Sequence, residues 1–297
     1  MSTTKEIIDA ARSEYLDDII LPYLWSNEEL LRALNEALNE WTKETLCLQD
    51  SSTEAICKIL LLSNQYTYDM DSRIVLIRRG RLVTGYPHLN IRDEPWMNDN
   101  LFAWETRTGT PCHIIPDYES GKLRTVPYFN TDGYFSGTMT ADDVTKTFTL
   151  AGQGFSTYLA VGNQVDIAGT LNDGVFTVAS VAADSFTVDE AVQTETVATV
   201  VRKVRDTLLL SVTRLPLSQL TIGAWQTQSP EIVSTDHNKL ISGILRKAYL
   251  KRDSQTFDPK AAETHRLLFE RDKGKAKTAR DRLRHPAQIL RPDAGTV

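Results

Sequence analysis

Residues 26–41 read SNEELLRALNEALNEW and carry the clearest helical pattern in the chain. Ser26, followed three residues later by Glu29, matches a capping box, in which two side chains satisfy backbone donors at a helix start. Apolar residues then recur three or four positions apart, as on one buried helix face: Leu30, Leu34, Ala37, Leu38 and Trp41. This stretch predicts an amphipathic helix that packs against a helical core.

Similar signals lie on either side of this stretch and near the C-terminal end. Thr3 and Glu6 repeat the capping-box spacing, and Pro22 falls in the break between the two N-terminal helices. Helical spacing returns over residues 240–249, and the pair at 258–259, Asp-Pro, supplies an N-cap and a first helical position. Both ends of the chain are therefore predicted to be helical.

The segment after the N-terminal helices changes to a strand pattern. Short β-branched and aromatic runs, separated by polar turn residues, occupy residues 56–62, 66–68 and 73–77. Arg78, Arg79 and Arg81 surround Gly80, and we interpret them as a basic turn. A solvated loop is the simplest interpretation of these arginines, and a contact with phosphate or a partner is the alternative.

Residues 136–201 differ from the rest in composition. Gly, Thr, Val and Ala are frequent, apolar residues alternate, and turn signals recur roughly every ten residues. This pattern predicts a small inserted all-β module, either a barrel or a sandwich. Residues 126–129 and 207–213 flank it and are interpreted as strands of one interrupted parent sheet.

The expected fold class is α+β, with N- and C-terminal helices forming a helical core around a central β-sheet. The inserted small all-β module interrupts that sheet. Four segments are expected. Residues 1–135 hold the N-terminal helices and the first β region, 136–203 the module, 204–270 the return strand and C-terminal helices, and 271–297 a basic docking tail.

Charge is unevenly distributed along a chain whose net charge is −6. Residues 136–200 hold eight acidic residues and one lysine, and residues 271–291 hold eight basic and two acidic ones. The basic segment either binds DNA phosphates or docks on a protein. The apolar Ile289 and Leu290 and the lack of interleaved aromatic residues favour protein docking. The residues expected to dock are Lys273, Lys275, Lys277, Arg280, Arg282, Arg284, Ile289 and Leu290.

Sequence motifs for catalysis are missing. There is no G-x-S-x-G, H-E-x-x-H, Walker or dinucleotide-binding pattern, and the histidines lack metal-ligand spacing. Cys112 and His113 are adjacent, but neighbouring strand residues point to opposite faces, which disfavours a nucleophile–base pair. Three scattered cysteines predict reduced thiols, and no apolar run approaches about 18 residues. We expect no enzyme activity, cofactor, metal site or membrane span.

A set of segments at both ends of the chain, outside the inserted module, forms a recognisable combination. The segments are EYLDD at 14–18, PYLWSNEELL at 22–31, LNEA at 34–37, LLSVTRLPL at 209–217, ISGILRKAYL at 241–250 and TFDP at 256–259, followed by residues 261–269. Together they resemble the head-to-tail adaptor proteins of tailed bacteriophages, also called head completion or connector proteins.

The resemblance implies a structural virion protein located at the neck, between head and tail, after assembly in the host cytoplasm. It implies a ring, usually of twelve copies, that sits under the portal protein, extends the DNA channel and attaches a tail or nozzle protein. Genomic DNA would pass through without sequence-specific binding. On this interpretation the basic tail docks on the portal, and deleting residues 271–297 should abolish portal binding while leaving the fold intact. Arg78, Arg79 and Arg81 are candidate contacts with the tail or the DNA channel.

Two other functions remain as alternatives. A nucleic-acid-binding protein would use the basic C-terminal segment and show steep salt dependence. An enzyme such as a cell-wall hydrolase would need paired carboxylates across a groove, and the adjacent acidic pairs of this sequence do not supply that arrangement.

Overall fold

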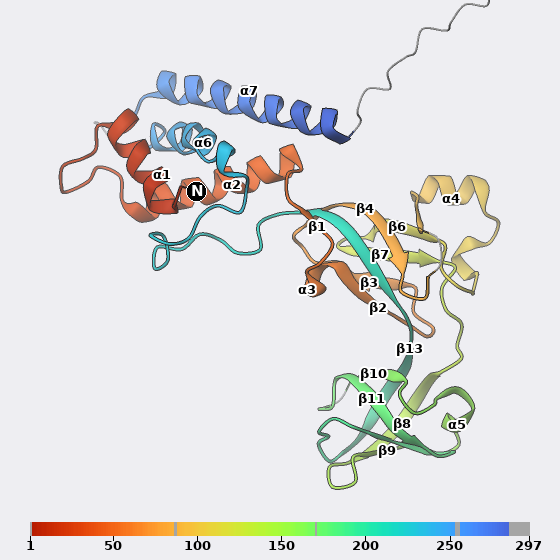
Figure 1. The fold of residues 1–297 in the computed structure, drawn as a ribbon. Helices are drawn as coiled ribbons and strands as arrows, with labels where there is room; N and C mark the ends of the chain where they lie inside the picture. Colours follow the sequence, from red (N-terminus) through yellow and green to blue (C-terminus); the bar gives the residue numbers. More distant parts are fainter. Residues whose placement is uncertain (1, 86–87, 170, 253–255, 285–297) are drawn as a thin grey trace, which may run out of the picture. The chain divides into compact units, whose positions relative to one another are not determined.

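The computed structural model describes residues 2–85, 88–169, 171–252 and 256–284, with side chains described up to residue 281. The chain divides into two compact units, whose elements are labelled in Figure 1. The helical unit comprises Met1–Asp50, Arg73–Leu76 and Thr213–Val297, and the β unit comprises Ser51–Ser72 and Ile77–Val212.

Helices dominate the helical unit. The elements are α1 (Thr4–Ala11), the π-helix η1 (Arg12–Leu16), α2 (Asn27–Thr45), β1 (Gln49–Asp50), η3 (Ser234–Asp236), α6 (Lys239–Ala248) and α7 (Pro259–Arg284). Both predicted capping boxes are confirmed. The Glu6 N–H donates to Thr3 Oγ1 at 3.2 Å, and the Glu29 N–H donates to Ser26 Oγ at 3.1 Å.

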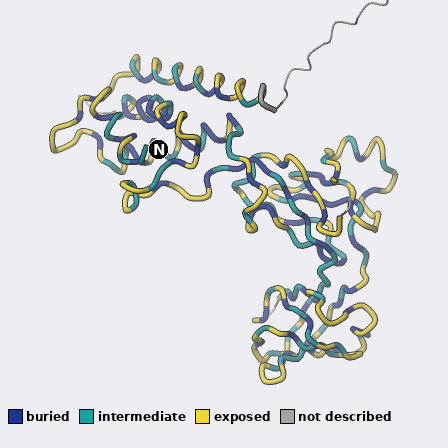
Figure 2. The backbone as a smooth tube through the Cα atoms, in the orientation of Figure 1, coloured by how far each residue is buried: buried dark blue, intermediate teal, exposed yellow. Residues whose placement is uncertain are grey.

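The apolar faces of α1, α2, α6 and α7 share one core (Figure 2). Trp41 of α2 packs against Phe269 of α7 with ring centroids 5.7 Å apart, and both side chains are buried. Gly243 lies where α6 passes closest to its neighbours, because an added Cβ would be 2.6 Å from Ala37 Cβ. Burying each large apolar side chain contributes about 1.5–3 kcal/mol, so this core holds the helices together.

A small closed barrel forms one part of the β unit. Its strands are β8 (Tyr134–Asp142), β9 (Thr147–Thr149), β10 (Gln164–Ala168), β11 (Gly174–Val181), β12 (Ser185–Val188) and the first part of β13 (Glu195–Arg214). They pair in the order β13, β10, β11, β12, β9, β8, and β8 pairs again with β13, from Glu195 opposite Ala141 to Arg202 opposite Tyr134. The helix α5 (Phe155–Tyr158) contributes Phe155, which packs with Phe148 and Phe186 in the barrel core.

The remainder of the β unit extends β13 and adds a second sheet. Its elements are α3 (Glu54–Cys57), β2 (Lys58–Leu62), β3 (Thr67–Asp69), β4 (Ile74–Leu82, from residue 77), β5 (Asn90–Ile91), α4 (Glu94–Asn100), η2 (Trp104–Thr106), β6 (His113–Glu119) and β7 (Lys122–Val126). The second part of β13 pairs with β2 and β4. The other strands form a four-stranded sheet in the order β3, β7, β6, β5.

The α+β fold class with an all-β module is confirmed, but two local expectations are wrong. Residues 78–81 lie inside β4 and do not form a turn, because Gly80 leaves room for the Ile114 side chain, which packs where a Cβ would stand. Residues 126–129 and 207–213 do not share a sheet either. Residues 195–214 contain no Gly or Pro, so β13 runs unbroken from the barrel onward, while β7 pairs with β3 and β6.

Candidate interaction surfaces

The basic C-terminal segment is helical over its described part, because α7 continues to Arg284. We expected a tail from residue 271. The Lys273 side chain is only 2% exposed and forms ion pairs with three glutamates: Glu40 at 2.6 Å, Glu44 at 2.9 Å and Glu270 at 2.9 Å. Burial lowers the pKa of Lys273, but hydrogen bonds to these carboxylates outweigh it and raise the pKa. Lys273 is a charged structural residue of the helical unit.

The other expected docking residues have different surroundings. Arg280 is partly buried and pairs with Asp236 of η3 at 2.9 Å, whereas Lys275 and Lys277 are exposed on α7. The side chains of Arg282 and Arg284 lie outside the described part of the chain, as do the residues Ile289 and Leu290. Of the expected docking set, the described side chains that present free charge to solvent are those of Lys275 and Lys277.

This arrangement changes the expected effect of truncation. Deleting residues 271–297 would remove the buried Lys273 and Ala276 and the Arg280–Asp236 pair. We now expect this deletion to destabilise the helical unit, because those residues pack against α2 and η3. A truncation that spares the helical unit must begin after Arg284.

Acid should destabilise the helical unit through three carboxylates whose pKa values are lowered. A backbone N–H from Ser26 lowers the pKa of Glu29. Burial raises the pKa values of Glu40 and Glu231, but hydrogen bonds from Arg246 and Lys273 to Glu40, and from Arg214 to Glu231, outweigh it. A lowered folded-state pKa contributes stability that is present above the unfolded-state pKa and lost as the pH falls through the folded value.

We therefore expect the urea midpoint of unfolding to be constant near neutral pH and to fall below about pH 4.5, with about 1 kcal/mol or less lost per carboxylate after solvent screening. Glu40→Gln should show a lower midpoint at neutral pH and a smaller further loss in acid. A Glu40→Gln variant with the same acid loss as the unchanged protein would contradict this assignment.

The three arginines of β4 are exposed along the strand. Within the described residues, Arg78, Arg79 and Arg81 have no carboxylate within ion-pair distance. β4 pairs with β13, and directly after β4 the Val83 N–H donates to the Thr207 carbonyl at 3.0 Å. The strand pairing therefore fixes the backbone while the guanidinium groups remain available to solvent.

A buried ion pair organises the segment between η1 and α2. The guanidinium of Arg12 pairs with the Asp18 carboxylate and also donates to the Trp25 carbonyl at 2.6 Å and to Asn27 Oδ1 at 2.9 Å. Asp18 in turn accepts the N–H of Leu24 at 2.7 Å and that of Trp25. The two ends of residues 18–25 are thus tied to the start of α2.

The same contacts leave an apolar loop in solvent. Ile19, Ile20 and Leu21 are 61%, 79% and 72% exposed, and Tyr23 and Leu24 are also exposed. We call residues 19–24 the apolar loop. The run IIL at 19–21, directly before Pro22, is the signal in the sequence for this exposed apolar patch.

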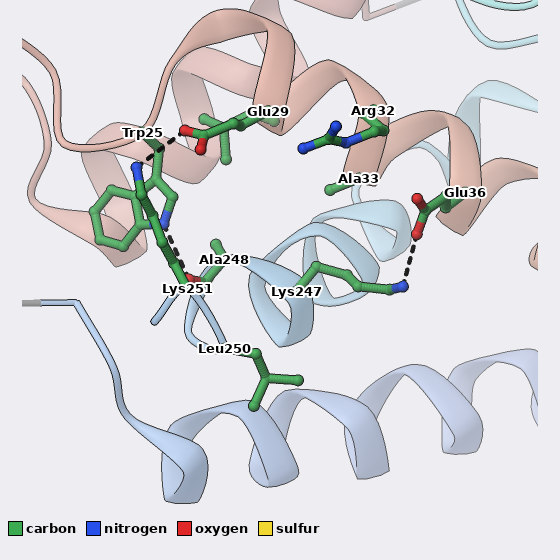
Figure 3. Close-up of a pocket in the computed structure, with 10 residues that line it drawn as sticks. Trp25, Glu29, Arg32, Ala33, Glu36, Lys247, Ala248, Leu250 and Lys251 are labelled. Carbon is green, nitrogen blue, oxygen red and sulfur yellow. Dashed lines mark hydrogen bonds and ion pairs between the residues drawn. The ribbon is translucent and has the colours of Figure 1, made fainter. Parts of the chain in front are cut away.

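A groove lies beside this loop, between α2 and the end of α6 (Figure 3). Its volume is about 290 Å³, and Trp25 and Leu250 line it. Lys251 pairs with Glu29 at 3.1 Å and Lys247 pairs with Glu36 at 2.6 Å. The guanidinium of Arg32 also borders the groove and has no ion pair within the described residues.

The described residues contain no cluster of three or more His, Cys, Asp or Glu that could hold a metal ion. No helix in the same part of the chain is long and apolar enough to cross a membrane. At the Cys112–His113 pair, burial raises the pKa of the Cys112 thiol, opposite to what a nucleophile needs. The His113 ring instead packs against Trp96, with centroids 5.6 Å apart.

Comparison with known proteins adds a family to these observations. No curated protein matches the chain. The family model described as SU10 adaptor protein matches residues 2–291, which covers both units and nearly the whole chain. The resemblance noted in the terminal helices therefore extends across the β unit. The chain belongs to the SU10 adaptor protein family, a family of phage head-to-tail adaptors.

Proposed function

We propose that the protein is a structural head-to-tail adaptor that forms a ring of twelve copies beneath the portal of a tailed phage. The ring extends the DNA channel and provides the attachment site for the tail. The observation that carries this proposal is the family match over residues 2–291. In the assembled virion the protein would lie at the neck, and genomic DNA would pass through the ring without sequence-specific contacts.

The portal contact is proposed for the solvent face of α7 and the residues beyond it. Lys275 and Lys277 support this because both are exposed on the same helix and lie close in sequence to the remaining basic and apolar docking residues. Lys273 and Arg280 instead stabilise the helical unit, because Lys273 pairs with Glu40 and Arg280 pairs with Asp236. The exposed arginines of β4, Arg78, Arg79 and Arg81, are proposed to contact the tail or the DNA in the channel.

Charge reversal on α7 tests the portal contact. We expect Lys275→Glu/Lys277→Glu, in the full chain, to weaken co-sedimentation with the purified portal about tenfold or more, because two favourable charges become repulsive. Truncation after Arg284 should weaken binding further. Thermal unfolding of both proteins should match the unchanged protein, because neither change removes a described buried side chain.

The matched control is Lys58→Glu/Arg107→Glu, which makes the same change of net charge at two exposed cations of the β unit. It should bind the portal like the unchanged protein. Full portal binding by both the Lys275→Glu/Lys277→Glu variant and the truncated chain would overturn the docking assignment. Tight, salt-sensitive binding of duplex DNA by the isolated chain, lost in the same variants, would favour the nucleic-acid alternative instead.

A further inference from the structure

The apolar loop and the groove are complementary features of one helical unit, and neither is used within the copy that carries it. Ile19, Ile20 and Leu21 remain mostly exposed, so the loop does not fold back into its own groove. Lys251 donates to the Leu24 carbonyl at 2.5 Å and Trp25 forms a wall of the groove, which ties the base of the loop to the groove's edge.

Leu250 borders a second cavity as well as the groove. This second cavity of about 380 Å³ lies between α6 and the first turns of α7 and shares Lys247 and Leu250 with the groove. Pro259 and Ala262 add apolar surface there. Leu250 itself is 50% exposed at the boundary between the two cavities. Leu250 thus forms a wall common to both cavities, which together we call the recess.

The charged side chains that line this recess form ion pairs with one another, with the exception of Arg32. Each glutamate of its lining has a cation of the same unit as partner: Glu29 with Lys251, Glu36 with Lys247, Glu40 with Arg246, and Glu263 with Arg266. Arg32 is left without an ion pair in the described residues. An occupant that suits the recess is therefore apolar and carries one acidic group.

The apolar loop of this same chain has that chemistry. Ile19, Ile20 and Leu21 supply the apolar surface, and Asp17, directly before them, is an exposed carboxylate with no ion pair in the described residues. Asp18 is already neutralised by Arg12. The arginine also fixes the base of the loop, so little ordering is required when the loop binds.

We propose that the apolar loop of one copy binds the recess around Leu250 in the next copy, with Asp17 pairing with Arg32. Each copy offers one loop and one recess, so the contact is heterologous, and a heterologous contact generates a ring when the rotation between neighbouring copies closes. The inference rests on the proposed function, because it names the surface through which copies of the adaptor join one another.

Substitution of the loop and of the recess should weaken self-association equally. We expect Ile20→Asp and Leu250→Asp each to weaken it about tenfold or more, measured by sedimentation across a concentration series. Val144→Asp, at an exposed apolar residue in the β unit, is the matched control and should behave like the unchanged protein. Thermal unfolding checks that every variant folds.

Mixing distinguishes this contact from other modes of association. An equimolar mixture of Ile20→Asp and Leu250→Asp chains retains one intact recess and one intact loop, so dimers should form and growth should stop there. Exchanging the charges of the proposed Asp17–Arg32 pair gives a second readout. Asp17→Arg and Arg32→Glu should each weaken self-association, and a chain that carries both substitutions should associate again, because the pair is restored with its charges reversed.

The inference is overturned if the unchanged chain does not self-associate, either free or on the portal, or if Ile20→Asp and Leu250→Asp associate normally. Portal co-sedimentation of the same variants is measured separately. Variants that bind the portal but do not join one another support the contact, whereas an unchanged chain that self-associates but ignores the portal contradicts only the proposed function.

Discussion

Arg12→Met is expected to destabilise the helical unit by about 3–5 kcal/mol, the range for removing one partner of a buried ion pair. The Arg12 and Asp18 side chains are 5% and 2% exposed, so Asp18 would be left as a buried charge without a counter-ion. Methionine retains an apolar stem of similar length, so the loss reflects the charge and its hydrogen bonds. Urea unfolding followed by circular dichroism measures the change.

Arg32→Met is the matched control for this substitution. Arg32 is exposed and has no ion pair in the described residues, so its replacement should change stability by about 0.5 kcal/mol or less.

In Arg12→Met, amide exchange at Leu24 and Trp25 should accelerate, because Asp18 no longer holds their N–H groups in place. Adding Asp18→Asn should recover part of the loss. Unchanged stability in Arg12→Met would show that the pair does not organise the loop.

Gly243→Ala is expected to destabilise the chain by about 2 kcal/mol, while Gly274→Ala stabilises it by about 0.5–1 kcal/mol. Both glycines lie inside helices, where alanine is intrinsically favoured. At Gly243 the added Cβ would meet Ala37 at 2.6 Å and Phe269 at 3.1 Å, so α6 must move away from α2 and α7. At Gly274 nothing lies within 4 Å of the added atom.

The opposite signs make these two variants controls for one another. Both make the same chemical change, so any general effect of alanine on the unfolded chain cancels in the comparison. The difference between their urea midpoints measures the cost of overpacking at the α6 crossing. Equal midpoints would mean that the helices of this unit are not packed as closely as the position of Gly243 requires.

Local signals in the sequence predicted local structure well. The capping boxes at Thr3 and Ser26 depend on residues three positions apart, and both formed as expected. Alternation and regular turns predicted the all-β module. They left open whether the module is a barrel or a sandwich, because closure depends on pairing β8 with β13 across more than 50 residues of intervening chain.

Features that depend on long-range geometry were missed for the same reason. Lys273 belongs to a basic run in sequence, and only the position of α2 shows that Glu40 and Glu44 also pair with it. Gly80 resembled a turn residue because nothing local reveals that Ile114 packs against it. Ile19, Ile20 and Leu21 fall between two of the family-like segments, 14–18 and 22–31, and their exposure follows from Arg12 and Asp18, which hold the base of the loop.

Cryo-electron microscopy of the purified protein mixed with the portal of its phage tests the central claim most directly. The adaptor account predicts a closed ring of copies stacked coaxially on the portal, with α7 facing the portal and an open channel along the axis. Single copies that remain unassociated with the portal, at concentrations where both proteins are folded, would contradict it.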